Sequence, residues 1–187
     1  VVNGAFRLDS AMQINAKSSL LSLDSDGFRA QGPEGDAFRA SLVPLLDAYL
    51  ALSKALSDDN EPGAREVVAE VASGLEAVRG DSLPSVGGGP WQDDAPLLDA
   101  AAASLEAAEG IEAIRVAFQP LSDTLLQVVR AYGWPAEGAA YEAYCPMAFD
   151  DTGASWIQIH RDIENPYFGA AMYACGTIRE TLPGGDR

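Results

Sequence analysis

The sequence is poor in the residues that most often carry out catalysis. Its 187 residues include a single histidine, His160, and only two cysteines, Cys145 and Cys175. It contains no Gly-x-Ser-x-Gly motif, no phosphate-binding glycine loop and no His-Glu-x-x-His motif. His160 has no obvious nucleophile near it in the sequence, and a lone imidazole is more often a surface or hydrogen-bonded residue than a metal ligand. We therefore predict that the protein is not an enzyme.

Positive charge is also scarce. There are 12 Lys and Arg residues against 28 Asp and Glu residues, which gives a formal net charge of −16 and a pI near 4.2. Such a surface repels the phosphate backbone of nucleic acids, so we predict no nucleic-acid partner. The simplest role of the excess negative charge is to keep a helical protein in solution.

Long hydrophobic runs are missing as well. No uninterrupted apolar run approaches the roughly 18 residues of a membrane-spanning helix, so we predict no transmembrane span in this chain. The hydrophobic content is nevertheless 48%, which is enough for a buried core. Because the chain begins at Val1 and shows no signal-peptide pattern, we expect a mature N-terminus or a fragment.

Four apolar patterns with helical spacing do occur, between residues 36 and 133. The first recurs at steps of three and four residues, the spacing of one buried helical face. Its members are Phe38, Leu42, Leu45, Leu46, Tyr49, Leu52 and Leu56. Patterns at 67–78 and 111–132 repeat this spacing, and an alanine-rich stretch from Asp99 has high helix propensity. Because the connections are short, we predict a mainly α fold, an antiparallel four-helix bundle over 36–133.

The flanking segments have a different composition. Residues 1–23 alternate loosely between apolar and polar side chains, which is typical of short β-strands whose partners lie elsewhere. Residues 24–35 have the glycine and polar composition of a linker. Residues 134–187 are rich in glycine, proline and aromatic residues. They predict a loop-rich Cys/Met cap packed on the bundle, with one short strand at 155–159.

Sulfur gives this cap its distinctive chemistry. Cys145 and Met147 lie two residues apart, and Met172 and Cys175 lie three apart, on one face of a helical turn if that stretch is helical. Thiolate and thioether sulfurs favour Cu(I) and similar soft ions over hard cations. These four residues are therefore our candidate metal ligands.

Two alternatives use the same thiols. A Cys145–Cys175 disulfide would close a loop of about 30 residues and stabilise the cap by roughly 3–4 kcal/mol in the chain-entropy model. The two cysteines could also be simple buried thiols. The sequence leaves a disulfide, a soft-metal site and buried thiols all open.

Several cap motifs together resemble a known family. They are Cys145-Pro146-Met147, Gly153-Ala154-Ser155-Trp156, Asn165-Pro166-Tyr167-Phe168-Gly169, and Met172 followed by Cys175-Gly176. These motifs look like a bacterial domain of unknown function that is appended to the C-terminus of CusB-like membrane-fusion adaptors. The resemblance covers roughly residues 38–182. Residues 4–17 separately resemble the end of an adaptor's membrane-proximal β-domain.

This resemblance implies a role and a location. It implies a periplasmic adaptor subunit of a resistance-nodulation-division (RND) efflux pump for heavy metals, with Cu(I) or Ag(I) as cargo. The implied partners are the RND pump, other adaptor protomers and a periplasmic metallochaperone. We weigh three hypotheses: a metal-binding accessory domain of the adaptor, a structural or docking module whose cap is held by a disulfide, and a stand-alone sensor or carrier.

Overall fold

The computed structural model describes residues 33–80 and 91–184, and the predicted β segment (1–23) lies outside them, as does most of the predicted linker (24–35). The described chain is mainly helical, which confirms the predicted fold class at that level. Its helices are α2 (Pro33–Ser41), α3 (Val43–Ser57), α4 (Glu61–Gly80), α5 (Trp91–Ala107) and α6 (Ile111–Tyr132), with the short α7 (Ala148–Asp151) and the 3-10 helix η1 (Gly169–Met172) in the cap. α2 thus begins within the range that the sequence assigns to the linker. No helix in residues 33–80 and 91–184 is long and apolar enough to cross a membrane.

The helix ends follow from local sequence. Pro44 occupies the first turn of α3, where its missing amide hydrogen costs no helical hydrogen bond. Gly110 and Gly133 flank α6 with φ of 83° and 90°, a backbone region that favours glycine. These residues punctuate the apolar patterns and divide them into separate helices.

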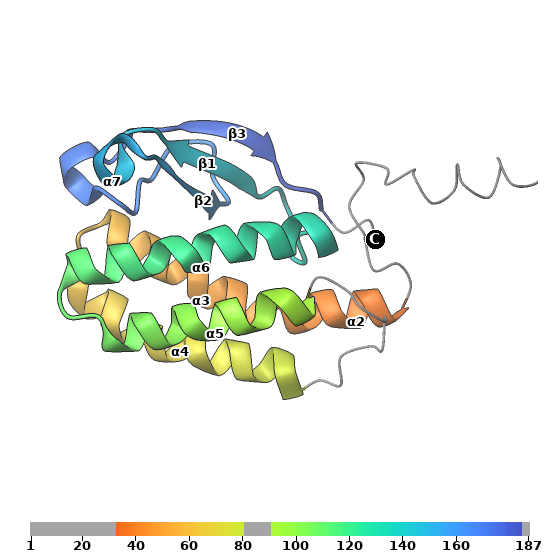
Figure 1. Ribbon diagram of the computed structural model, residues 1–187. Coiled ribbons are helices and arrows are strands. Elements are labelled where there is room, and N and C mark those ends of the chain that lie inside the picture. Colours follow the sequence, from red (N-terminus) through yellow and green to blue (C-terminus); the bar gives the residue numbers. More distant parts are fainter. Residues whose placement is uncertain (1–32, 81–90, 185–187) are drawn as a thin grey trace, which may run out of the picture.

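The four long helices are arranged as two hairpins. A turn at 58–60 joins α3 to α4 and a turn at 108–110 joins α5 to α6, and both turns lie at the same end of the molecule (Figure 1). α4 also packs against α5, which brings the two hairpins together. At Gly74 of α4, an added Cβ would lie 2.7 Å from the Leu45 Cα of α3. This close approach explains a glycine inside a helix, where it costs roughly 1 kcal/mol relative to alanine.

The apolar patterns predicted from the sequence do form the core. Every member of the first pattern is buried, and so are Ile114, Phe118, Leu121, Leu125 and Val128 of α6. The rings of Tyr49 and Phe118 stack with centroids 5.0 Å apart. Helical spacing therefore identified the buried face of each of these helices.

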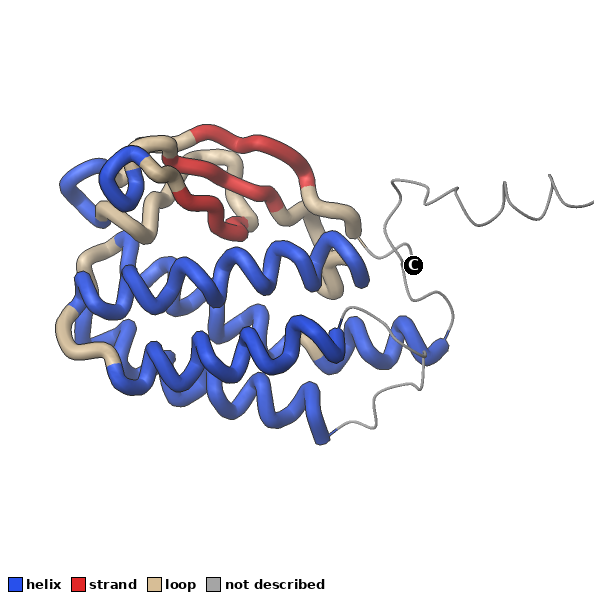
Figure 2. Tube along the Cα trace, in the orientation of Figure 1, coloured by secondary structure: helices blue, strands red, loops and turns tan. Residues whose placement is uncertain are grey.

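A three-stranded antiparallel sheet forms a second layer over the helices (Figure 2). Its strands are β1 (Tyr141–Cys145), β2 (Ala154–Gln158) and β3 (Thr177–Thr181), in the order β2-β1-β3. The prediction of a loop-rich cap with one strand at 155–159 was incomplete, because it missed β1 and β3. β1 pairs with β3 across more than 30 residues of sequence, and five-residue strands give little periodic signal of their own.

Buried hydroxyl groups connect the sheet to the helices. The Tyr49 hydroxyl oxygen accepts a hydrogen bond from the Ile157 amide of β2 at 2.9 Å, and it lies 2.8 Å from the Ser122 hydroxyl of α6. Burial raises the pKa of Tyr49, so its hydroxyl stays protonated and continues to serve this network. The Tyr167 hydroxyl donates to the Ser155 carbonyl of β2 at 2.8 Å. The sheet is thereby set at a fixed position over α3 and α6.

Candidate metal centre

Three of the four predicted sulfur ligands come together at one end of the sheet. The Sγ atoms of Cys145 and Cys175 lie 3.3 Å apart, and the Cys175 Sγ lies 3.9 Å from the Met147 Sδ. Both cysteines are free thiols. Cys145 is fully buried, Cys175 is partly buried, and Met147 is 47% exposed. The cluster therefore runs from a buried thiol outward to a thioether at the surface.

Met172 contacts the cluster through its backbone. Its carbonyl oxygen accepts a hydrogen bond from the Cys175 amide at 3.0 Å. Among the described residues, neither the Cys145 nor the Cys175 thiol donates a hydrogen bond to the Met172 sulfur. The structure thus groups Cys145, Met147 and Cys175, and gives Met172 a contact through the backbone.

Sheet pairing explains why the two thiols meet. Cys145 is the last residue of β1, and Tyr144 pairs with Thr177 of β3. Antiparallel pairing carries the chain just before β3 past the end of β1, which brings Cys175 beside Cys145. Gly176 lies between Cys175 and β3 with φ of 145°, and an added Cβ would lie 3.0 Å from both the Trp156 ring and the Tyr144 carbonyl. The positive φ and the close contacts at this position therefore favour glycine next to the thiol.

The electrostatics of the pair favour the protonated form of the Cys175 thiol. The hydrogen bond between the two cysteines raises the pKa of Cys175, and burial raises it further. Metal ions bind the thiolate, so a soft ion must displace the thiol protons when it binds. In residues 33–80 and 91–184, no group of three or more His, Cys, Asp and Glu side chains could hold a metal ion. A site here would therefore depend on sulfur, including the thioether of Met147.

The single histidine lies in another place. His160 is exposed and helps to line a pocket of about 320 Å³ between α3 and β2, together with Lys54, Gln158 and Glu164. The Lys54 ammonium lies 2.5 Å from the Asp58 carboxylate, so its charge is already paired. None of the cluster's sulfur residues lines this pocket.

A strained turn follows directly after Met147. Phe149, Asp150 and Asp151 have φ of 52°, 55° and 64°, three consecutive left-handed residues of which none is glycine. Each such residue costs on the order of 1 kcal/mol or more, and strain of this kind persists only where surrounding contacts hold it. Here the Phe149 ring packs against Tyr167, with centroids 5.3 Å apart, and the Gly153 amide donates to the Ala148 carbonyl at 2.8 Å.

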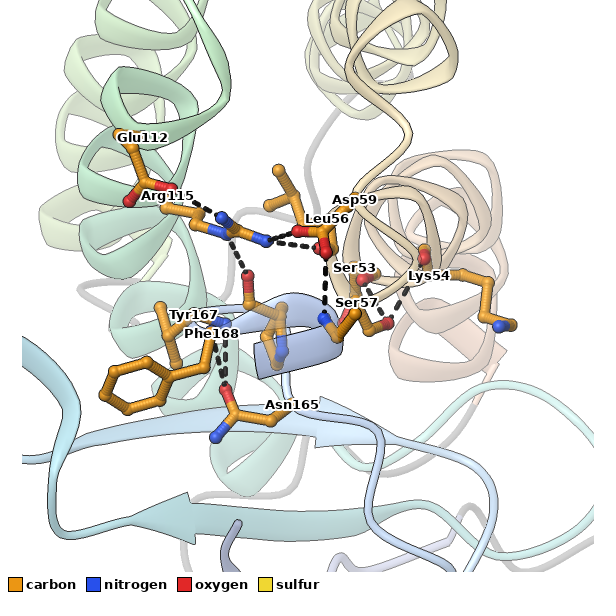
Figure 3. Close-up of polar contacts among 12 residues, drawn as sticks. Ser53, Lys54, Leu56, Ser57, Asp59, Glu112, Arg115, Asn165, Tyr167 and Phe168 are labelled. Carbon is orange, nitrogen blue, oxygen red and sulfur yellow. Dashed lines mark hydrogen bonds and ion pairs between the residues drawn. The ribbon is translucent and has the colours of Figure 1, made fainter. Parts of the chain in front are cut away.

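A buried arginine attaches the cap to the helices near Pro166, a role that the sequence did not predict. The Arg115 guanidinium of α6 is 6% exposed and lies 2.5 Å from the Asp59 carboxylate in the α3–α4 turn. It also donates to the carbonyls of Leu56 at 2.9 Å and Pro166 at 3.0 Å, and to Glu112 at 2.6 Å (Figure 3). Asp59 in turn accepts a hydrogen bond from the Ala170 amide at 2.9 Å. One cation thus joins both helical hairpins to the segment around Pro166.

Asn165 is the second residue whose role the sequence analysis missed. An Asn-Pro pair is typical of a turn, and the structure shows that the Asn165 side chain is fully buried. Its Oδ1 atom accepts from the amides of Tyr167 and Phe168, at 2.8 and 3.3 Å (Figure 3). An Asn before Pro is a recognisable turn signal, but its contacts elsewhere in the cap depend on the tertiary structure.

Comparison with known proteins finds one family model that covers the helical part of the chain. Residues 45–136 match a family model described as a protein of unknown function (DUF3347). The match runs from α3 through α6 and ends before β1, so the sulfur cluster lies outside it. No curated protein and no solved structure matches the chain.

Proposed function

We propose that this domain binds one soft monovalent cation, Cu(I) or Ag(I), through Cys145, Cys175 and Met147. The observation that carries the proposal is the convergence of two thiols, 3.3 Å apart, with a thioether 3.9 Å from one of them. Two thiolates and a thioether suit a soft ion of this class and suit Ca²⁺ or Mg²⁺ poorly. The gradient of exposure gives the ion a route, from the exposed Met147 inward to the buried Cys145.

The scaffold of the site, on this proposal, is an antiparallel four-helix bundle formed by α3–α6. The cap that carries the sulfurs is attached to it through Arg115 and Tyr49. A rigid support matters because a ligand set binds tightly only if its atoms are held close to their bound positions. No step of catalysis is part of this proposal, and the domain acts as a non-enzymatic binding module.

The biological setting that we propose is a periplasmic adaptor of a heavy-metal RND efflux pump. The support is the resemblance of the cap motifs to the domain appended to CusB-like adaptors. In that setting the partners are the RND pump, other adaptor protomers and a periplasmic metallochaperone. The domain would serve as an accessory that holds the metal ion before export.

A second function is favoured by the same 3.3 Å distance. Two thiols this close need only a small movement of one side chain to form a disulfide. Cys145 is also fully buried, so a bulky metal carrier has no direct access to its thiol. The cap would then be a structural or docking module without a metal role. Free-thiol counting before and after reduction distinguishes the two functions for the isolated protein.

Competitive titration of the reduced protein with Cu(I) against a chelator tests the first proposal. We expect one Cu(I) per chain, loss of binding in Cys145→Ser and Cys175→Ser, and weakening in Met147→Leu. Met172→Leu is the matched control, because the same substitution there leaves the three clustered sulfurs in place, and it should bind like wild type. Failure of wild type to compete, or equal weakening by both methionine substitutions, would contradict the proposed ligand set.

A further inference from the structure

We infer that Asn165 is the positioning residue of the sulfur cluster, because it holds the backbone of Cys175 beside Cys145. This inference deepens the proposed function and rests on it for its biological meaning. Asn165 is not a metal ligand in this inference, because its side chain bonds to the backbone of Cys175 and not to a sulfur atom.

The Asn165 side chain uses both its donor and its acceptor in this role. Its Nδ2 atom donates to the Cys175 carbonyl oxygen at 2.7 Å, while its Oδ1 atom accepts from Tyr167 and Phe168. Its backbone amide also donates to the Tyr173 carbonyl at 2.8 Å. The chain segment 173–175 is therefore bonded at two carbonyls to one fully buried residue. A buried amide with all of these partners leaves the segment little freedom to move.

Asn165 is itself held by the helices. The Pro166 carbonyl next to it accepts from the Arg115 Nε atom at 3.0 Å, and the Ala170 amide donates to Asp59 at 2.9 Å. Gly169, with φ of 55°, packs so closely against Asp59 and Arg115 that an added Cβ would force the charged ends of these two side chains to move. Asn165 and Pro166 thus connect Cys175 to α6 and to the α3–α4 turn, and these helices fix its position.

Cys145 needs no such device, because it is part of the sheet. It is the end residue of β1 and pairs with Ala154 of β2. Cys175 lies outside β3 and is held by the Met172 carbonyl and by Asn165. Loss of the Asn165 hydrogen bond should therefore release one thiol and leave the other in place.

The thiol–disulfide equilibrium with glutathione measures this positioning without any metal. The thiolate of the partly exposed Cys175 attacks glutathione disulfide and releases one glutathione thiolate. The Cys145 thiolate then attacks the Cys175 sulfur of the mixed disulfide and releases the second glutathione. The protein loses two electrons and two thiol protons, and the two glutathione thiols receive them. The square of the reduced glutathione concentration divided by the oxidised glutathione concentration, at half oxidation of the protein, is the effective concentration of one thiol at the other.

The test compares Asn165→Ala and Asn165→Asp with Thr124→Val. Asn165→Asp keeps the acceptor for Tyr167 and Phe168 and replaces the donor to Cys175 with an oxygen that repels the Cys175 carbonyl, so it also serves if the alanine variant does not fold. Thr124→Val removes a buried hydroxyl that donates only to the Pro120 carbonyl within α6. We expect both Asn165 variants to lower the effective thiol concentration by about tenfold, the effect of one buried hydrogen bond, with Thr124→Val unchanged.

Each outcome bears on the inference. Folded Asn165 variants whose effective thiol concentration equals that of wild type would overturn it, and so would a wild-type pair that stays reduced at every glutathione composition. A tenfold loss in the Asn165 variants with no Cu(I) binding by wild type would uphold Asn165 as the positioning residue and refute the metal proposal alone. If wild type binds Cu(I), the Asn165 variants should bind it about tenfold more weakly.

Discussion

The Arg115 guanidinium lies 2.5 Å from the Asp59 carboxylate, although 56 residues separate them in the sequence. The pair connects the first turns of α6 to the turn between α3 and α4. Because Arg115 also donates to Pro166 and Asp59 also accepts from Ala170, the pair fixes the cap as well as the helices. The ion pair is therefore a joint among three parts of the molecule rather than a surface contact.

We expect Arg115→Met to destabilise the protein by about 2–4 kcal/mol, because it leaves the buried carbonyls of Leu56 and Pro166 without their donor. Urea unfolding followed by far-ultraviolet circular dichroism measures the change. Arg65→Met is the matched control, since the pair that Arg65 makes with Glu61 is exposed and 3.8 Å long, and it should cost less than about 1 kcal/mol. Equal losses in the two variants would show that Arg115 has no special structural role.

Gly169→Ala should be far more damaging than Gly138→Ala. Both glycines have positive φ, 55° and 89°, so each substitution carries a backbone strain of about 1 kcal/mol. At Gly138 an added Cβ meets nothing within 4 Å, whereas at Gly169 it overlaps Asp59 and Arg115. We expect a loss of unfolding free energy about 2 kcal/mol larger for Gly169→Ala, as is typical of overpacking. Similar melting temperatures in the two variants would contradict the packing described here.

The Asp59 carboxylate should make stability depend on pH in the acid range. The hydrogen bond from Arg115, and next the one from the Ala170 amide, lower the pKa of Asp59 in the folded protein. The unfolded chain then binds the proton more tightly, so the stability that Asp59 contributes is complete above its unfolded pKa of about 3.9 and is lost as the pH falls through its lower folded pKa. Asp59→Asn should therefore be less stable than wild type at pH 7, and the difference should shrink as the pH falls through the lowered folded pKa of Asp59.

Asp94 should give the opposite sign in the same experiment. Burial raises its pKa, and its Oδ2 atom has no hydrogen-bond partner among the described residues. The ionised carboxylate therefore destabilises the folded state at neutral pH, and protonation relieves this as the pH falls through the raised pKa. We expect Asp94→Asn to raise the melting temperature at pH 7 and to lose that advantage toward acid pH. Parallel pH curves for Asp94→Asn and wild type would refute this expectation.

Oxidation of the thiols should abolish metal binding. A Cys145–Cys175 disulfide consumes both thiolates and leaves the Met147 thioether, which alone is a weak ligand. We expect protein oxidised with glutathione disulfide to take up no Cu(I) or Ag(I), and reduction to restore one ion per chain. Equilibrium dialysis with Ag(I) on the two forms measures this. Equal uptake by the oxidised protein would place the ion at another site.

Local sequence was enough to predict the helical part of the fold. The steps of three and four residues from Phe38 to Leu56 and from Ile111 to Tyr132 correspond to buried faces of α2, α3 and α6. A helix is a local structure whose hydrogen bonds and apolar face repeat within a few residues, so a single stretch of sequence carries the signal. Pro44, Gly110 and Gly133 marked ends of helices for the same reason.

The sulfur residues show where this local reasoning ends. The sequence by itself determined the donor types, and with them the class of ion that we propose for the cap. Only the tertiary structure placed Met147 with the two thiols and left Met172 to contribute its carbonyl oxygen. It did so through the pairing of β1 with β3 and through the contacts of Arg115 and Asn165, each of which joins residues far apart in the sequence. Contacts of this kind depend on which surfaces meet when the helices and the sheet pack. The spacing of residues within one segment does not predict which surfaces these are.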